Sequence, residues 1–180
     1  MINSDKNNAK LDNITLIVLD VDGTMTDGGI YIDSNRVETK KFNIKDGAGI
    51  LLAQSVGIEF MLLTGRSSAC VKQRASELNI KYIAQEIKSK ADYLKDFMSD
   101  NGFLPEHIAY IGDDLNDLPA MHYIGVSACP IDAADEVKEY CDFILPQKGG
   151  EGVVRAFVEI LLKEKKTWEE AIINLFPIIK

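Results

Sequence analysis

The chain has 180 residues, enough for one domain with a substantial core. It carries 20 basic and 28 acidic residues, a formal net charge of −8, which argues against nucleic acid as a partner. Its apolar runs are far shorter than the ~20 residues that cross a bilayer, and its polar start has no apolar signal core, so we expect no membrane association. Three cysteines without C-x-x-C spacing predict free thiols and a cytoplasmic protein.

The first part of the chain predicts a strand, a hairpin and a helix. Residues 1–12 are polar and predict a flexible N-terminal segment. The β-branched apolar run at 14–19 predicts a strand covered on both faces. Residues 30–42 predict a β-hairpin with a polar turn. A helix over 47–56 is expected to be capped by Asp46.

From residue 58 onward, strand and helix patterns alternate. The predicted strands are 58–63, 82–84, 107–111, 124–127 and 143–145. The predicted helices are 67–78, 90–101, one starting near 114–116, 133–140 and 152–163. This alternation is typical of an α/β fold, a Rossmann-like parallel sheet with helices on both faces. We expect one catalytic domain over 13–163, and an apolar tail over 164–180 that packs on the core or on a neighbouring subunit.

Polar residues follow several of the predicted strands. Asp20, Thr64 and Asp113 each come directly after an apolar run or one residue later. Ligands of parallel sheets bind beyond the carboxyl ends of the strands. We therefore expect these side chains to converge at one edge of the sheet.

Two of these strand ends carry short motifs. Asp20 and Asp22 are followed by Gly23, which lets the chain turn so that both carboxylates face one site. Two close carboxylates repel each other and need a cation or a shared proton. Thr64-Gly65-Arg66 leads into a predicted helix, and it fits either a phosphate cradle or a simple N-cap turn.

Two further motifs lie later in the chain. Lys90 starts a predicted helix, where the helix dipole does not favour a cation, although a solvated lysine is the simpler alternative. Gly112-Asp113-Asp114-x-x-Asp117 places three carboxylates within five residues, which suits a divalent metal. For Asp114 and Asp117 an acidic helix start is an equally simple explanation.

Taken in order, these four motifs over residues 20–117 resemble those of the haloacid dehalogenase superfamily. Segments 27–31, 41–50, 111–114 and 148–152 resemble one subgroup, the 3-deoxy-D-manno-octulosonate 8-phosphate phosphatases and their nonulosonate 9-phosphate relatives. The resemblance implies a HAD-like fold with a hairpin flap and no cap domain, assembled as a homotetramer. It also implies a Mg²⁺-dependent phosphatase that acts on a phosphorylated sugar acid, as in lipopolysaccharide biosynthesis.

The resemblance also implies a role for each matching residue. Asp20 would be the nucleophile that forms an aspartyl-phosphate, Asp22 the general acid and base, and Thr64 and Lys90 the catalytic groups that stabilise the phosphate. The implied metal ligands are the carboxylates of Asp20 and Asp113 and the backbone carbonyl of Asp22. Asp114 and Asp117 would not bind the metal directly and would orient these ligands or a water molecule. The implied substrate contacts are Asp22, Asn43, Ile44, Lys45, Asp46, Gly47, Thr64, Gly65, Arg66, Arg74 and Lys90.

The substrate itself stays open at this point. Arg66 and Arg74 lie eight residues apart and would share a helix face suited to a sugar acid. Leu51 and Glu151, however, stand where the octulosonate enzymes carry basic residues, so a nonulosonate 9-phosphate of the sialic acid or KDN type is an alternative. A phosphorelay domain or a non-catalytic α/β domain is an alternative of another class.

Overall fold

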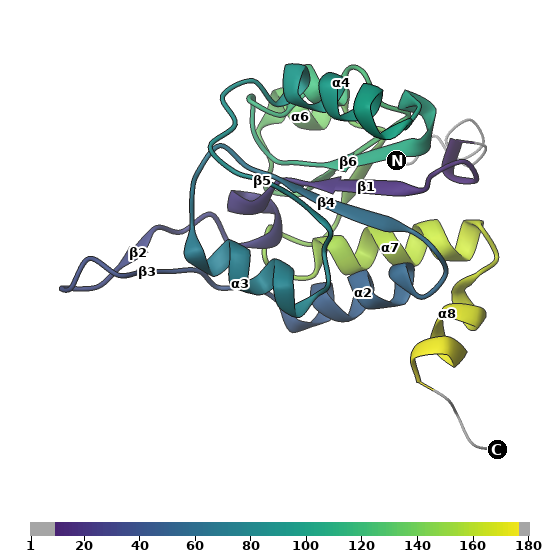
Figure 1. Ribbon diagram of the computed structural model, residues 1–180, viewed down its shortest axis with the longest axis horizontal. Coiled ribbons are helices and arrows are strands. Elements are labelled where there is room, and N and C mark those ends of the chain that lie inside the picture. Colours follow the sequence, from purple (N-terminus) through teal and green to yellow (C-terminus); the bar gives the residue numbers. More distant parts are fainter. Residues whose placement is uncertain (1–9, 177–180) are drawn as a thin grey trace.

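The computed structural model describes residues 10–176. Six parallel strands form one sheet in the order β5-β4-β1-β6-β7-β8 (Figure 1). These strands are β1 Leu16–Leu19, β4 Glu59–Leu63, β5 Tyr82–Ala84, β6 Ile108–Ile111, β7 Val126–Pro130 and β8 Phe143–Leu145. The central strand β1 pairs with β4 on one side and β6 on the other. The predicted parallel α/β sheet is confirmed.

Helices cover both faces of this sheet (Figure 1). They are α2 Ile44–Gln54, α3 Ala69–Glu77, α4 Lys90–Asn101, α5 Leu118–Met121, α6 Asp135–Tyr140, α7 Val153–Glu164 and α8 Trp168–Leu175. In β1, Ile17 and Leu19 pack with the layer of α2, α3, α7 and α8, whereas Leu16 and Val18 pack with α4, α5 and α6. All four side chains are fully buried, which explains why this strand is apolar throughout.

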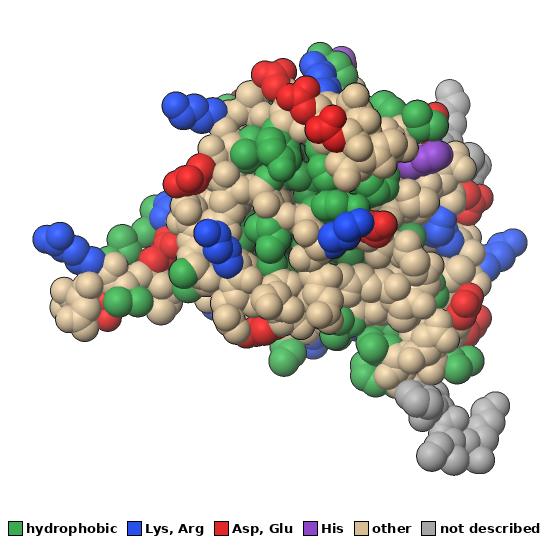
Figure 2. Space-filling view, viewed as in Figure 1, with side chains coloured by type: hydrophobic (Ala, Val, Ile, Leu, Met, Phe, Trp, Pro, Cys, Tyr) green, Lys and Arg blue, Asp and Glu red, His purple; other side chains and the backbone are tan. Residues whose placement is uncertain are grey.

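A hairpin, β2 Tyr31–Ile32 and β3 Glu38–Thr39, projects from the chain between β1 and α2 (Figure 1). Apolar side chains lie exposed along it, among them Ile30, Ile32 and Val37 (Figure 2). Across residues 10–176 the structure shows no cap domain, so this hairpin is the flap that the sequence predicted.

Two of the helix starts that differ from the predictions bear on the predicted site residues. Helix α2 begins at Ile44 because Asn43, not Asp46, is its cap: the side chain of Asn43 accepts from Lys45 N at 2.8 Å. Helix α3 begins at Ala69, two residues later than predicted. Arg66 therefore lies in the loop before α3, and the prediction that it shares a helix face with Arg74 is wrong.

Packing begins earlier in the chain than predicted. Leu11 is fully buried in the core layer of α2 and α7, although it belongs to the segment predicted to be flexible. Residues 1–9 and 177–180 lie outside the described residues. Among the described helices, none is both long enough and apolar enough to cross a membrane.

The C-terminal tail forms helix α8, which packs partly on its own core. Ala171 is fully buried, Ser55 Oγ donates to its carbonyl at 3.4 Å, and Asn174 Nδ2 donates to Ser55 O at 3.0 Å. Ile173 and Phe176 remain exposed. Contact of this tail with a neighbouring subunit stays a prediction.

Candidate active site

The carboxyl ends of β4, β1 and β6 meet at one edge of the sheet. Asp20, Thr64 and Gly112 extend these strands, because their backbone N–H groups donate to carbonyls of adjacent strands at 2.9, 3.0 and 3.2 Å. A cavity of about 190 Å³ opens at this edge. It is lined by Asp20, Asp22, Thr64, Gly65, Arg66, Asp113, Asp114 and Asn116. The predicted convergence of Asp20, Thr64 and Asp113 is confirmed.

The loop after β1, Val21–Met25, winds back toward this cavity. Gly23 has φ +95°, and a Cβ atom there would lie 2.0 Å from Asp113 Oδ2. Only glycine combines this backbone conformation with such close contact. Thr24 Oγ1 donates to Asp113 Oδ1 at 3.2 Å and so joins the two acidic motifs.

The glycine pair Gly149-Gly150 packs against the outside of this loop. Gly150 N donates to Thr24 O at 2.9 Å, and a Cβ atom on Gly149 would lie 1.8 Å from Gly23 O. Gly149 therefore allows the segment before α7 to pack directly on the loop that carries Asp22.

We expect Gly149→Ala to lower kcat about 100-fold, because the methyl group must displace the catalytic loop and a shift of 1 Å can cost that much. Steady-state kinetics and thermal unfolding would measure the effect. Gly57→Ala is the control: Gly57 has φ +87° and no atom within 4 Å of a Cβ, so it should lose stability and keep its kcat. Equal kcat losses in both variants would contradict the packing role of Gly149.

Asp20 is buried beside Lys90, the first residue of α4. Lys90 Nζ donates to Asp20 Oδ1 and, at 2.6 Å, to Asp117 Oδ1. Burial, followed by repulsion from Asp117, raises the pKa of Asp20 well above its usual value, and Lys90 only partly offsets this. Burial lowers the pKa of Lys90, but the two carboxylates outweigh burial and raise it, so Lys90 stays charged.

Asp117 is fully buried behind the cavity, and Tyr110 is a partner that the sequence did not predict. Tyr110 Oη donates to Asp117 Oδ1 at 2.7 Å. The backbone N–H groups of Asp113 and Asp114 donate to Asp117 Oδ2 at 3.1 and 3.3 Å. Both oxygens are thus occupied by donors, which supports an orienting role for Asp117. The signal in the sequence was a hydroxyl inside an otherwise apolar strand.

Carboxylate oxygens of Asp20, Asp113 and Asp117 lie within 4.8 Å of one another. Burial, followed by repulsion from Asp117, raises the pKa of Asp113 to about 7. One lysine does not balance three carboxylates, and hard oxygen donors in this number suit Mg²⁺. Because the oxygens of Asp117 are already bonded, Asp20 and Asp113 are the candidate metal ligands of this cluster.

Comparison with known proteins identifies the family to which this chain belongs. Residues 82–157 match a family described as haloacid dehalogenase-like hydrolase. The chain is 37% identical over 163 residues to 3-deoxy-D-manno-octulosonate 8-phosphate phosphatase of Escherichia coli (strain K12), covering 91% of this chain and 87% of that protein. This chain belongs to the haloacid dehalogenase-like hydrolases. It is a phosphoric monoester hydrolase, and the phosphorelay and non-catalytic alternatives are not supported.

Solved structures of such hydrolases share its fold. An octulosonate 8-phosphate phosphatase from Moraxella catarrhalis, in complex with magnesium, phosphate and KDO, has a TM-score of 0.93 and 35% identity, and the match covers 96% of this chain and 99% of that one. The corresponding enzyme from Yersinia pestis has a TM-score of 0.89 and 33% identity, over 92% of this chain and 89% of that one. The predicted resemblance and the HAD-like fold are confirmed.

We expect Mg²⁺ to raise the melting temperature of this hydrolase more at pH 7.5 than at pH 5. The pKa of Asp113 is raised to about 7 in the folded protein, against ~3.9 in the unfolded chain. Without metal, the protonated Asp113 carboxyl therefore contributes fully to the free energy of unfolding below pH ~4. This contribution is lost as the pH rises through about 7. At pH 5 the metal must displace that proton.

At a concentration of 100 times its Kd, Mg²⁺ should raise the free energy of unfolding by about 2.7 kcal/mol. For this chain length, that corresponds to a rise in melting temperature of roughly 5–11 °C. At pH 5 we expect less than about half of this shift. Differential scanning fluorimetry with and without Mg²⁺ measures both values, with Asp113→Asn as the control that should lose the pH dependence. Equal shifts of the wild type at both pH values would refute the competition between proton and metal.

Several predicted substrate contacts do not reach the cavity of this hydrolase. Asp22, Thr64, Gly65 and Arg66 line the cavity, and Lys90 lies beside Asp20. Asn43 instead caps α2, with its Nδ2 donating to Gly150 O at 3.2 Å, and Ile44 is exposed to solvent.

Asp46 does not line this cavity, and its contact with substrate stays a prediction. Asp46 is 2% exposed, and its Oδ1 accepts from Arg155 N in the first turn of α7 at 2.8 Å. Burial raises its pKa to about 6, although backbone N–H groups of α7 oppose the shift. The carboxylate thus stabilises the N-terminus of α7, where the helix dipole favours negative charge.

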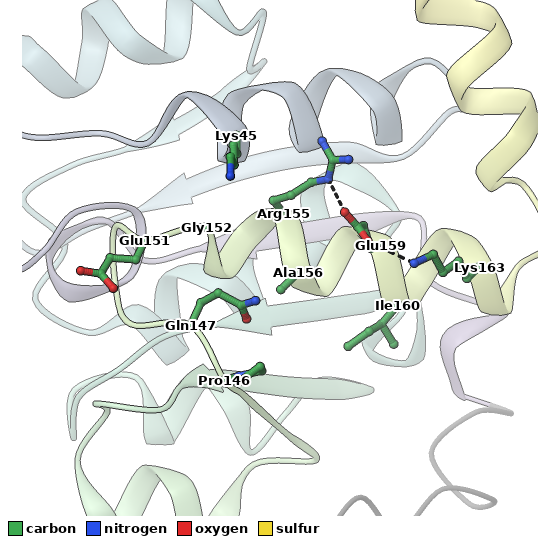
Figure 3. Close-up of a pocket in the computed structure, with 10 residues that line it drawn as sticks. All are labelled: Lys45, Pro146, Gln147, Glu151, Gly152, Arg155, Ala156, Glu159, Ile160 and Lys163. Carbon is green, nitrogen blue, oxygen red and sulfur yellow. Dashed lines mark hydrogen bonds and ion pairs between the residues drawn. The ribbon is translucent and has the colours of Figure 1, made fainter.

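Lys45 and Glu151 line a separate cavity of about 400 Å³ beside α7 (Figure 3). Within it, Glu159 pairs with Arg155 at 2.8 Å and with Lys163 at 3.1 Å. Lys45, predicted to contact substrate, therefore does not line the catalytic cavity of its own chain, and Glu151 does not add negative charge to it.

Arg74 and Gly47 do not line the catalytic cavity either. Arg74 pairs with Glu77 at 3.1 Å and lines a third cavity, of about 460 Å³, between the flap base and α3. A Cβ atom on Gly47 would lie 2.4 Å from Arg74 Nη2, so Gly47 makes room for this side chain. Arg66, by contrast, faces the catalytic cavity.

Proposed function

We propose that this hydrolase removes phosphate from a sugar acid of the 3-deoxyoctulosonate 8-phosphate type, with Asp20 as nucleophile. The observation that carries the proposal is the buried Asp20 held by Lys90 at a cavity shared with Asp22 and Asp113. The Moraxella catarrhalis relative, whose structure contains magnesium, phosphate and KDO, supports this substrate class.

In this reaction the Asp20 carboxylate attacks phosphorus and forms an aspartyl-phosphate. Asp22 protonates the leaving sugar oxygen and then takes a proton from the water that hydrolyses the intermediate. Thr64 and the backbone N–H groups that follow it hold phosphate oxygens, and Lys90 balances the charge of the nucleophile. Asp20, Asp113 and the carbonyl of Asp22 would hold Mg²⁺, which would supply positive charge at the transferring phosphate.

We also infer a homotetramer. The catalytic cavity, about 190 Å³, is smaller than the roughly 300–1,000 Å³ that encloses a drug-sized ligand. One chain therefore encloses the phosphate and leaves the sugar open. The flap exposes Ile30, Ile32 and Val37, which suits contact with another copy. Light scattering that gives the monomer mass would contradict this inference.

Free thiols at Cys70, Cys129 and Cys141 favour a cytoplasmic enzyme.

A nonulosonate 9-phosphate is the second candidate, because Leu51 and Glu151 depart from the octulosonate pattern. In this chain, however, Leu51 is half-buried against the core and Glu151 lines the cavity beside α7. Neither changes the charge of the catalytic cavity. Arg66 does line it and suits a carboxylate of the substrate.

A phosphate-release panel tests the proposal. Octulosonate 8-phosphate, a nonulosonate 9-phosphate, a hexose phosphate and p-nitrophenyl phosphate are compared with Mg²⁺ and with EDTA. We expect the highest kcat/KM with octulosonate 8-phosphate and loss of release in EDTA. A preference for the nine-carbon substrate would favour the second candidate. A flat profile would refute both.

A further inference from the structure

Lys40 lies one residue after β3, at the base of the flap, and its side chain is only 3% exposed. The neighbouring Lys41 is 64% exposed. A buried ammonium group requires a carboxylate partner. The partner is Asp22: Lys40 Nζ donates to Asp22 Oδ1. The flap thus reaches the loop that carries Asp22 through a partly buried charged contact.

Two cations from different elements lie beside the Asp22 carboxylate, and Lys40 alone donates a hydrogen bond to it. Arg66 Nε lies 3.9 Å from Asp22 Oδ2, beyond hydrogen-bond distance. Glu38 Oε1 joins the two cations, at 2.6 Å from Arg66 Nη2 and 3.6 Å from Lys40 Nζ. Asp22 Oδ1 is therefore fixed by Lys40, whereas neither cation lies within hydrogen-bond distance of Oδ2.

The backbone on both sides of this contact is anchored. Thr26 and Phe42 pair as an antiparallel bridge, which ties the chain after Lys40 to the loop after Asp22. Cys70 Sγ donates to the carbonyl of Glu38 at 3.3 Å and ties the flap base to α3. Because both ends are held, the Lys40–Asp22 contact can set the direction of the carboxylate.

We propose that Lys40 is a positioning residue that aims Asp22 Oδ2 at the leaving oxygen of the substrate, an inference that rests on the proposed function. By holding Oδ1, Lys40 fixes the plane of the carboxylate and leaves Oδ2 as the oxygen directed away from this contact. As the bond between phosphorus and the leaving oxygen breaks, its electron pair goes to that oxygen and the proton follows, which leaves Asp22 as a carboxylate. The base of the flap thereby contributes to proton transfer without touching the substrate.

The dependence on the leaving group tests this role. p-Nitrophenolate leaves without a proton, whereas the alkoxide of a sugar phosphate needs one. We expect Lys40→Met to lower kcat/KM for octulosonate 8-phosphate about 100-fold, and for p-nitrophenyl phosphate by less than about 5-fold. Lys40→Arg should recover part of the loss. Lys41→Met, the same change at the exposed neighbour, should behave as wild type.

The ratio of the two kcat/KM values does not depend on how much of a variant is folded, so partial unfolding cannot imitate the result. An unchanged ratio in Lys40→Met, with both substrates lost equally or with neither affected, would overturn the proposal. Asp22→Asn separates the two levels of inference. If Asp22→Asn leaves the ratio unchanged, the acid role in the proposed function fails. If it changes the ratio and Lys40→Met does not, only the role of Lys40 fails. If the wild type rejects octulosonate 8-phosphate, any alkyl phosphate that it hydrolyses serves in its place.

Discussion

Asp20→Asn is expected to lower kcat by at least about 10⁴-fold, the scale seen when a nucleophilic residue is removed. The amide cannot form the acyl phosphate, whereas the rest of the cavity stays in place. Phosphate release with the preferred substrate measures the loss, and rapid quench with labelled substrate should show no phosphoenzyme.

The same variant should fold at least as stably as the wild type when Mg²⁺ is absent. Burial and repulsion from Asp117 raise the pKa of Asp20, so removing its charge relieves an unfavourable interaction while Lys90 keeps Asp117 as a partner. Asp135→Asn is a matched control, since Asp135 is exposed on α6 and should affect neither rate nor stability. Near-normal phosphate release from Asp20→Asn would refute the nucleophile assignment, and a large stability loss would refute the electrostatic account.

The elements with strong local signals could be predicted from the sequence. Strand β5 Tyr82–Ala84 and helix α4 Lys90–Asn101 match the predicted bounds. Helix α4 has both of its ends encoded locally, with Ser89 accepting from Asp92 N and Gly102 in the left-handed conformation after it. Asp20, Thr64 and Asp113 could be placed together because strand ends in a parallel sheet share an edge.

The failures concern side chains whose partners are distant in sequence. Asp46 looked like a cap of its own helix, but it bonds to α7, 109 residues away. Nothing local in the sequence shows that the hydroxyl of Tyr110 meets Asp117. Nothing local separates Lys40 from Lys41 either, and only the fold of the flap buries the side chain of Lys40. Local pattern thus predicts elements and strand-end motifs, whereas the supporting hydrogen bonds depend on tertiary contacts.

Lys90→Met is expected to impair both folding and catalysis, for separable reasons. Without the ammonium group, the buried Asp20 and Asp117 lose their shared partner. Breaking a buried ion pair on one side typically costs about 3–5 kcal/mol, which urea unfolding without Mg²⁺ would measure. The loss of positive charge at the transferring phosphate should lower kcat about 10²–10³-fold. Lys88→Met is the matched control, because Lys88 is exposed two residues earlier and should leave both quantities unchanged.

Combining Lys90→Met with Asp117→Asn separates the two effects. The second change removes one of the carboxylates left without a partner, so the double variant should regain part of the stability lost in Lys90→Met. Its kcat should stay low, because Lys90 acts on Asp20 and the phosphate, whereas Asp117 lies behind both. Recovery of kcat in the double variant would mean that Lys90 serves only to neutralise Asp117. Recovery of stability alone would show that one lysine has two tasks, since it permits the burial of the acidic cluster and provides the charge that phosphoryl transfer needs.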